Sequence, residues 1–161
     1  MIKTARLRLR NFLPADAEVM QEYRSTQECS EYQRYDGTGI EYLRSFVKNF
    51  SASSFPSTEE EQHYAIAELS SNGIVGDLSV FFSERDRCFT LGITVSPAHQ
   101  RNGYAYEILF SVISKLKASY PEAEQVALID RENEKSISLF KKLGFKLECY
   151  AESVSSYVFV K

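Results

Sequence analysis

The chain has 161 residues, of which 43% are hydrophobic and 25% are charged. Both fractions are close to those of globular proteins, which excludes wholesale disorder and favours one domain over residues 1–161 without disulfide staples. The net charge is −3, from 19 basic and 22 acidic side chains. This balance does not favour a nucleic-acid partner, although a local basic patch stays compatible with it.

Several other classes of protein are also disfavoured. The three cysteines, Cys29, Cys88 and Cys149, lie far apart without a Cys-x-x-Cys, so neither a disulfide framework nor a metal site is expected. Cys88 and Cys149 fall in expected strands and are expected to be buried there. The sequence contains no run of about 18 apolar residues, so neither a membrane span nor a membrane partner is expected. The first residues lack an apolar signal-peptide core, which favours a cytoplasmic protein.

The first part of the chain predicts a strand and two helices. Alternating residues over 4–11 predict a half-solvated strand, and Pro14 with acidic neighbours begins a helix that extends to Thr26. Residues 30–39 predict a loop. Apolar residues at helical spacing over 42–50 predict the second helix, and the Ser-rich, acidic residues 51–61 predict a mobile connection.

The remainder predicts strands interleaved with two more helices. Residues 63–69 and 74–82 flank a Ser-Asn-Gly turn and predict a hairpin, and 88–95 adds another strand. A long helix is expected from Asn102, then a strand over 125–129, a helix over 134–143 that ends at Gly144, and strands over 145–150 and 156–160. This order predicts an α+β fold, a mixed sheet with helices on both faces. The apolar stripe of the long helix is expected to comprise Tyr106, Leu109, Phe110, Ile113 and Leu116.

The start of the long helix carries the strongest functional signal. The first backbone N–H groups of a helix lack intrahelical partners and lie at the positive end of its dipole, so an anion placed there gains several hydrogen bonds. Gly103 allows a ligand close to the backbone, Arg101 adds charge and Asn102 tolerates turn geometry. An ordinary strand-to-helix loop is the alternative. The segment is neither a Walker A loop nor a dinucleotide fingerprint.

A second segment has a comparable position between a strand and a helix. Asn133 stands at a capping position and Ser136 in the first helical turn. By itself this segment has a purely structural interpretation, in which Asn133 caps the helix, Ser136 satisfies its first turn and Gly144 ends it.

Together the two segments resemble the signatures of the GNAT superfamily of N-acetyltransferases. Gln100-Arg101-Asn102-Gly103-Tyr104-Ala105 is similar to the family's acyl-CoA loop, and residues 133–145 are similar to its second signature. The resemblance spans essentially the whole chain. The arginine-rich first strand and Gly103-Tyr104-Ala105-x-Glu107 resemble more narrowly the branch that acetylates the N-termini of ribosomal proteins. The resemblance implies a mostly antiparallel seven-stranded sheet with a splayed parallel strand pair.

The resemblance also implies a reaction, the transfer of an acetyl group from acetyl-CoA to a primary amine in a ternary complex. The amine would be a protein N-terminus or a small amine. The pyrophosphate would lie on the amides of residues 100–105 and the pantetheine on the strand before them, whose Ile93 or Val95 N–H would stabilise the oxyanion. Phe140 would pack on the cofactor arm. The implied cofactor-binding residues are Ile93, Thr94, Val95, Gln100, Arg101, Asn102, Gly103, Tyr104, Ala105, Asn133, Ser136 and Phe140, and the implied catalytic residues are Ser136 and Val95.

The sequence departs from the family pattern at two positions. Phe140 stands where many members carry a tyrosine general acid, and Thr90 stands where many carry a glutamate base. Ser136 is therefore expected to donate a hydrogen bond to the leaving thiolate. Proton removal through water has three distant candidates, none of them preferred: Asp77, Glu68 and Tyr157.

Other side chains have open or structural interpretations. His63 and His99 lack metal-spaced partners and are expected to be non-catalytic, and Glu107 is expected to complement the helix dipole rather than act as a base. The basic group Lys141, Lys142 and Lys146 forms a solvated face or meets the 3′-phosphate of CoA. The tyrosines Tyr32, Tyr35 and Tyr42 wall an acceptor pocket or pack the two helices.

Two other functions stay open. Thr90 and Phe140 are compatible with a module that binds acyl-CoA with little or no turnover, and a structural subunit without a nucleotide ligand is a third possibility. The protein is expected to be a monomer or a homodimer, in which the two terminal strands would pair across the interface.

Overall fold

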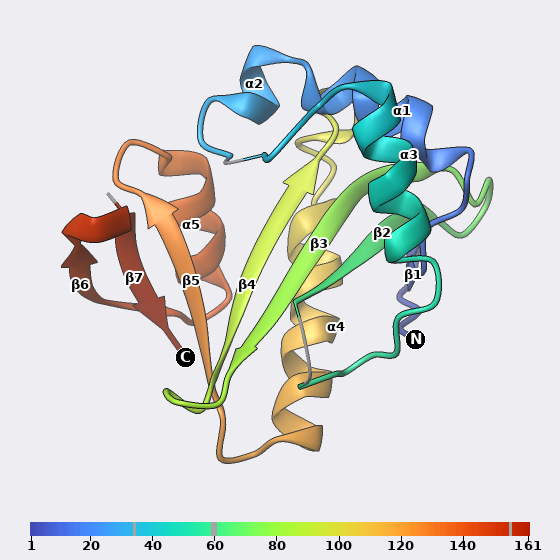
Figure 1. The fold of residues 1–161 in the computed structure, drawn as a ribbon. Helices are drawn as coiled ribbons and strands as arrows, with labels where there is room; N and C mark the ends of the chain where they lie inside the picture. Colours follow the sequence, from blue (N-terminus) through green and yellow to red (C-terminus); the bar gives the residue numbers. More distant parts are fainter. Residues whose placement is uncertain (34, 59–60, 155) are drawn as a thin grey trace.

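The structure is a computed structural model, and it describes residues 1–33, 35–58, 61–154 and 156–161. A seven-stranded sheet of order β1-β2-β3-β4-β5-β7-β6 forms its centre (Figure 1). The strands are β1 (Leu7–Arg10), β2 (Gln62–Glu68), β3 (Ile74–Ser83), β4 (Cys88–Val95), β5 (Glu124–Asp130), β6 (Lys146–Ala151) and β7 (Ser156–Val160). The helices are α1 (Asp16–Arg24), α2 (Gln27–Ser30), α3 (Ile40–Asn49), α4 (Tyr104–Ser119) and α5 (Glu134–Lys142), and 3₁₀ turns occur at Pro97–His99 and Glu152–Val154.

The predicted α+β class is confirmed, and the predicted strands and helices are found in the predicted order. One helix was not predicted: α2 is a single turn whose start is capped by Thr26, which accepts a hydrogen bond from the backbone N–H of Cys29 at 3.3 Å. A helix this short leaves no apolar periodicity in the sequence. β1 is also shorter than expected, because the chain turns before it and Thr4 N–H donates to the Leu7 carbonyl at 2.8 Å.

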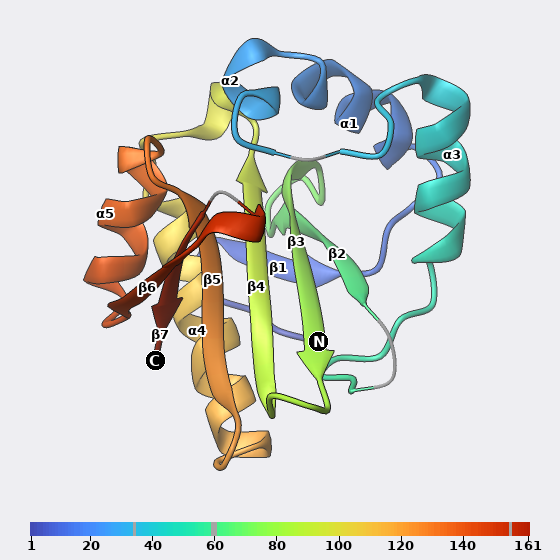
Figure 2. The same cartoon turned by 60° about the vertical axis from the view of Figure 1, so that its left-hand side comes forward.

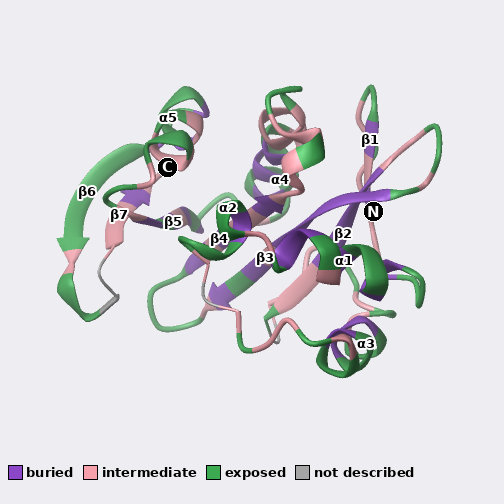
Figure 3. Ribbon diagram, turned by 90° about the horizontal axis from the view of Figure 1, so that it is seen from above, coloured by how far each residue is buried: buried purple, intermediate pink, exposed green. Residues whose placement is uncertain are grey.

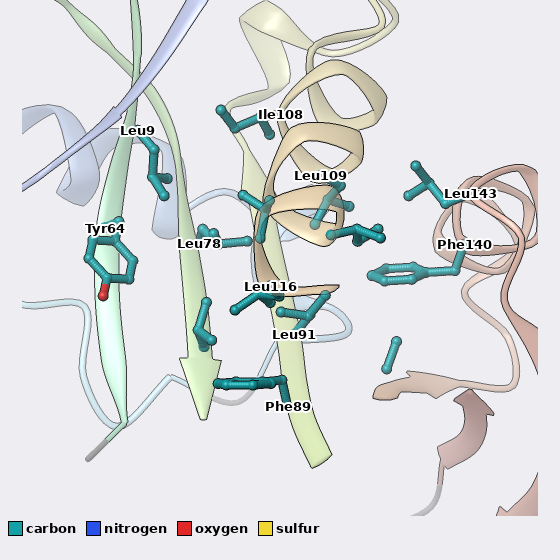
Figure 4. Close-up of a cluster of buried hydrophobic side chains, with 14 of the residues drawn as sticks. Leu9, Tyr64, Leu78, Phe89, Leu91, Ile108, Leu109, Leu116, Phe140 and Leu143 are labelled. Atoms are coloured by element: carbon teal, nitrogen blue, oxygen red, sulfur yellow. The ribbon is translucent and has the colours of Figure 1, made fainter. Parts of the chain in front are cut away.

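Helices cover both faces of the sheet, with α1 and α3 on one face and α4 and α5 on the other (Figures 1 and 2). The alternation of side chains along β3 shows how one strand serves both layers. Leu78 points into the cluster that packs on α4 and α5, whereas Asp77 and Ser79 point the opposite way. The larger core includes Leu9, Leu91, Ile108, Leu109 and Phe140 (Figure 4), and the smaller core under α1 and α3 includes Met20, Leu43, Phe46 and Ala65.

The apolar stripe predicted on α4 is only partly correct. Leu109, Ile113 and Leu116 are buried as expected, but Phe110 is 55% exposed and its ring stacks on that of Tyr106 at a centroid distance of 6.1 Å. The helix also buries Ile108 and Val112, so its apolar residues surround more than one face. Periodicity therefore could not identify the buried side.

The expectation that Cys149 is buried is wrong. This side chain is exposed, whereas those of Cys29 and Cys88 are buried. β6 is the last strand in the sheet order, and Figure 3 shows it as exposed along most of its length. A strand pattern predicts burial only where a layer covers the strand, which edge strands often lack. The pairing of terminal strands across a dimer stays a prediction.

Among the described strands, β4 and β5 form the one parallel pair, and they separate after three residue pairs. The register runs from Cys88 opposite Glu124 to Thr90 opposite Val126. Beyond that point β4 continues along β3 as far as Val95, and β5 continues along β7 as far as Asp130. The predicted splayed pair is confirmed, and Figure 1 shows the two strands diverging. We call the unpaired stretch between residues 91–95 and 127–130 the strand gap.

Candidate functional site

The chain between β4 and α4 forms a cradle of free backbone amides at residues 101–105. Arg101 and Gly103 have φ values of 62° and 75°, so left-handed residues alternate with ordinary ones, which turns successive N–H groups to the same side. In the described part of the chain these amides donate no backbone hydrogen bond outside α4, and the first turn of a helix offers none inside it. The sequence indicated that Asn102 tolerates turn geometry, and the structure has its neighbours Arg101 and Gly103 in the left-handed conformation.

Side chains of the same loop hold its shape. Gln100 Nε2 donates to the Val95 carbonyl at 3.0 Å, and Asn102 Nδ2 donates to the His99 carbonyl at 3.2 Å. The Tyr104 hydroxyl donates to Glu68 at 2.9 Å, which joins the loop to β2. This amide cradle is therefore built before any ligand arrives.

Glu107 ties the start of α4 to the chain that leads into β1. Its carboxylate accepts hydrogen bonds from the Thr4 hydroxyl at 2.5 Å, from the Arg6 backbone N–H at 2.9 Å and from Arg6 Nε at 2.7 Å. Burial opposes ionisation of Glu107, but these hydrogen bonds outweigh it and lower its pKa. Glu107 is thus a structural anion with all its partners in place, which agrees with the expectation that it is not a base.

The edge of β4 that faces the strand gap offers backbone groups at Ile93 and Val95. Ser96 N–H donates to the Val75 carbonyl on β3 at 2.9 Å. Every second residue of a strand directs its backbone N–H and C=O to the same side, so those of Val95 and Ile93 point away from β3. Accordingly the Ile93 carbonyl accepts from Gln33 Nε2 at 3.2 Å rather than pairing with β3. The oxyanion role of the N–H groups of these two residues stays a prediction. Thr94 instead contacts Tyr35, at 3.1 Å between their hydroxyls.

Across the strand gap, the start of α5 has both a structural cap at Asn133 and an unpaired hydroxyl at Ser136, among the residues that the structure describes. Asn133 Oδ1 accepts from the Ser136 backbone N–H at 3.1 Å, so Asn133 caps the helix. The Ser136 hydroxyl is half-buried and has no hydrogen-bond partner among the residues that the structure describes. Phe140 is 3% exposed and lies in the core (Figure 4). Its ring is perpendicular to that of Phe145. Its predicted packing on the cofactor arm is therefore limited to the small part of the ring that the core leaves uncovered.

A cavity of about 170 Å³ lies on the α1–α3 side of the sheet and reaches β4 at Gly92, Ile93 and Thr94. Tyr35 and Tyr42 line it, which supports the pocket-wall interpretation for these two tyrosines, whereas Tyr32 is exposed and does not line it. The other side chains that line it include Phe46, Asp36, Glu61, His63 and Ser79.

A buried ion pair forms part of the cavity wall. Arg24 Nη2 lies 2.8 Å from Asp77 Oδ1, and the Tyr23 hydroxyl donates to Asp77 Oδ2 at 2.5 Å. The guanidinium of Arg24 lies over the rings of Tyr35 and Phe46, 4.6 and 4.8 Å from their centroids. Burial and the neighbouring carboxylate together raise the pKa of Tyr23 well above its usual value. Both oxygens of Asp77 are occupied, so its role is to hold the wall together.

A shallow groove runs from the amide cradle along the outer side of α4. Arg6, Gly103, Tyr106, Phe110 and Lys142 line it, and Lys142 Nζ lies 4.9 Å from the centroid of the Tyr106 ring. Of the three lysines weighed for a CoA phosphate, Lys142 is therefore the one beside the cradle. Among the described residues no three His, Cys, Asp or Glu side chains gather as a metal site requires, and no helix has the length and apolar character needed to cross a membrane.

Comparison with known proteins identifies the family to which this chain belongs. Residues 6–146 match the family model described as an acetyltransferase (GNAT) domain. The chain belongs to the GNAT acetyltransferase family. The family activity is acetyl transfer from acetyl-CoA, so the predicted reaction class and co-substrate are confirmed.

Individual relatives agree with this assignment. The chain is 25% identical over 150 residues to the uncharacterized N-acetyltransferase YoaA of Bacillus subtilis, across 92% of this chain and 84% of the relative. A GNAT-family acetyltransferase from Bacillus anthracis has a TM-score of 0.82 at 19% identity, covering 99% of this chain and 96% of the other. The microcin C7 self-immunity acetyltransferase MccE, solved with acetyl-CoA and AMP, has a TM-score of 0.80 at 16% identity, covering 98% and 92%. The two solved structures show the shared GNAT fold.

Sequence reasoning missed the cavity and did not place His63 on its wall. The cavity joins residues from α1, the loop before α3, α3 itself, and strands β2 to β4, which are separated by up to 70 positions in the chain (Arg24 to Thr94). The one available signal was the alternation in β2 and β3, which places His63 and Ser79 on the same face of the sheet as Asp77.

Proposed function

We propose that residues 1–161 form a single acyl-CoA N-acyltransferase domain that transfers the acetyl group to a primary amine in a ternary complex. One observation carries this proposal: the amide cradle, the strand gap and the cavity meet at the same end of β4, where Ile93 borders both the gap and the cavity. A thioester held in the gap would thus face a nucleophile in the cavity. Direct attack needs no covalent enzyme intermediate, because alignment of the two reactants supplies much of the acceleration.

Each part of the site has a separate task in this proposal. The amides of residues 101–105 bind the pyrophosphate, and the edge of β4 that β5 leaves unpaired pairs with the amide-containing pantetheine arm. The N–H of Ile93 or Val95 stabilises the oxyanion of the tetrahedral intermediate. The hydroxyl of Ser136 donates to the leaving thiolate. Lys142, beside Tyr106, faces the phosphorylated ribose end of the cofactor.

The cavity defines the class of acceptor. Asp36, Glu61 and Asp77 contribute three carboxylates against the single cation of Arg24, and the aromatic walls add affinity for a cation. A volume of about 170 Å³ is close to that of an engineered cavity that holds one benzene ring. The acceptor is therefore a small amine or the first residue of a protein N-terminus. The arginine-rich β1 continues to favour the ribosomal-protein branch.

Release of free CoA thiol from acetyl-CoA, measured across a panel of small amines and N-terminal peptides, tests the proposed function. Turnover with a cationic primary amine is expected, and N-acetylated analogues of the same compounds should be inactive. Tight binding of CoA without turnover across the panel would favour the alternative binding module instead. A melting temperature that does not rise with CoA would favour a structural subunit.

Replacing Ser136 by alanine is expected to lower kcat by about 10- to 100-fold, because a hydrogen bond to a charged group contributes about 1.5–3 kcal/mol. Affinity for acetyl-CoA should stay close to that of the wild type, since the thiolate forms only as the bond breaks. Ser138→Ala, on the exposed side of the same helix, is the matched control. Unchanged turnover of the Ser136 variant would refute the role.

A further inference from the structure

A row of three residues crosses the sheet from β2 to the strand gap. His63 on β2 is opposite Ser79 on β3, and Ser79 is opposite Gly92 on β4. All three line the cavity, and two inter-strand spacings of about 4.8 Å separate the first from the last. A Cβ atom on Gly92 would lie 2.5 Å from the Ser79 hydroxyl oxygen, so glycine leaves the space that this hydroxyl occupies. The row connects the imidazole to the place where the thioester is aimed.

The carboxylates around the cavity are poor proton acceptors for an ammonium group. Asp77 already accepts from Tyr23 and from Arg24, which occupies both of its oxygens. Glu61 has a side chain that is 56% exposed, and one of its carboxylate oxygens already lies 3.4 Å from His63 Nε2. Thr90, which stands where many family members carry glutamate, has no basic group. An imidazole is closer to the basicity that proton transfer near pH 7 requires.

The surroundings of His63 keep its imidazole neutral and leave it short of partners. Its side chain is 18% exposed, and the rings of Phe46 and Phe50 lie 4.8 and 4.6 Å from it. Nε2 lies 3.4 Å from a Glu61 carboxylate oxygen, whereas Nδ1 is buried and finds no hydrogen-bond partner among the described residues. Burial lowers the pKa of His63 below its usual value. The charges of Glu61, Asp77 and Asp36 oppose this shift, and that of Arg24 adds to it.

We propose that His63 is the proton acceptor of the acetyl transfer and that the Ser79 hydroxyl relays the proton to it. The inference rests on the proposed function. The ammonium group of the bound acceptor passes one proton to Ser79 Oγ while the Ser79 hydroxyl proton passes to the unprotonated ring nitrogen of His63. The nitrogen lone pair that this frees attacks the thioester carbonyl carbon and forms the C–N bond. The C–S electron pair leaves with the thiolate toward Ser136, the thiolate takes the second proton from the new amide nitrogen, and the imidazolium, stabilised by Glu61, releases its proton to water.

The Ser79 hydroxyl is suited to this relay. It belongs to β3, which lies between β2 with His63 and β4 with Gly92. Ser79 is half-buried, and its hydroxyl makes no hydrogen bond within the described residues. A hydroxyl both accepts and donates, so it passes a proton on without holding a charge. Ser83 on the same strand serves as the contrast, because its hydroxyl donates to Asp86 at 2.8 Å in a turn that does not line the cavity.

The pH dependence of kcat for His63→Gln and Ser79→Ala, with Ser83→Ala as control, tests the inference. With an amine that the wild type acetylates, His63→Gln is expected to lose about 100-fold in kcat at pH 7, the range of general-base catalysis. The deficit should shrink to less than about tenfold at pH 9.5, where an α-amine of pKa about 8 has already lost its proton. Ser79→Ala should show a smaller loss with the same pH trend, and Ser83→Ala should match the wild type.

Binding of CoA and a cooperative melting transition verify that each variant is folded, and if His63→Gln is not, Ser79→Ala decides the outcome. A His63→Gln enzyme that keeps at least half of its kcat at pH 7 would overturn the inference, and so would a loss that is equal at all pH values, which indicates a structural role. An inactive wild type that binds CoA would overturn the proposed function and this inference with it. An active wild type with an unaffected His63→Gln variant would overturn the inference alone.

Discussion

Replacing Asp77 by alanine is expected to lower the free energy of unfolding by about 3–5 kcal/mol, the loss seen when one partner of a buried ion pair is removed. Arg24 is 4% exposed and would keep its charge without a counter-ion, and the Tyr23 hydroxyl would lose its acceptor. Urea titrations followed by circular dichroism measure the change.

Two further variants identify the cause. The double variant Arg24→Met with Asp77→Ala should recover part of the loss, because it leaves no buried charge unpaired. Glu18→Ala breaks an ion pair with Arg44 in which both side chains are more than half exposed, and it should leave the midpoint unchanged. An Asp77→Ala protein within about 1 kcal/mol of the wild type would show that the pair does not support the cavity wall.

Replacing Gly103 by valine is expected to weaken CoA binding by more than about 100-fold. Gly103 has φ +75°, which a β-branched residue adopts only with strain, and its amide belongs to the proposed pyrophosphate cradle. Loss of two charge-assisted hydrogen bonds corresponds to about 3–6 kcal/mol, and 1.4 kcal/mol is tenfold in affinity. Calorimetric titration with CoA measures the effect.

Gly144→Val is the matched control for this substitution. Gly144 has φ +91°, so valine imposes a similar backbone strain, but it follows α5 and does not belong to the cradle. Its CoA affinity should stay within about threefold of the wild type even though its stability falls. If both variants lost affinity equally, general destabilisation rather than the cradle would be responsible.

Local patterns were sufficient to predict most of the fold. Alternation and turn residues located the hairpin of β2 and β3, where Asn72 adopts φ 57°, and the Asn133 cap and Gly144 stop located α5. The patterns failed where burial depends on distant elements. Nothing local separates Cys88, on a strand inside the sheet, from Cys149 on the sheet edge, and the exposed Phe110 belongs to a helix with apolar residues on more than one face.

The same distinction between local and distant determinants applies to the candidate site. The amide cradle is a local feature, and its residues were predicted from one continuous segment. The sequence did not indicate that Arg101 takes the left-handed conformation. The cavity could not be predicted, since its wall depends on the Arg24–Asp77 pair, 53 residues apart in the chain. His63 became a candidate only when the register placed it opposite Ser79.

The backbone amide resonances of residues 101–105, followed by NMR as CoA is added, test most directly whether the free amides at the start of α4 hold the pyrophosphate. The largest shifts are expected at these amides and at those of Ile93 and Val95, while β6 should change little. Pantetheine, which lacks the pyrophosphate, should shift the amide resonances of Ile93 and Val95 but not those of the cradle. Saturable CoA binding that leaves residues 101–105 unshifted would contradict the proposed site.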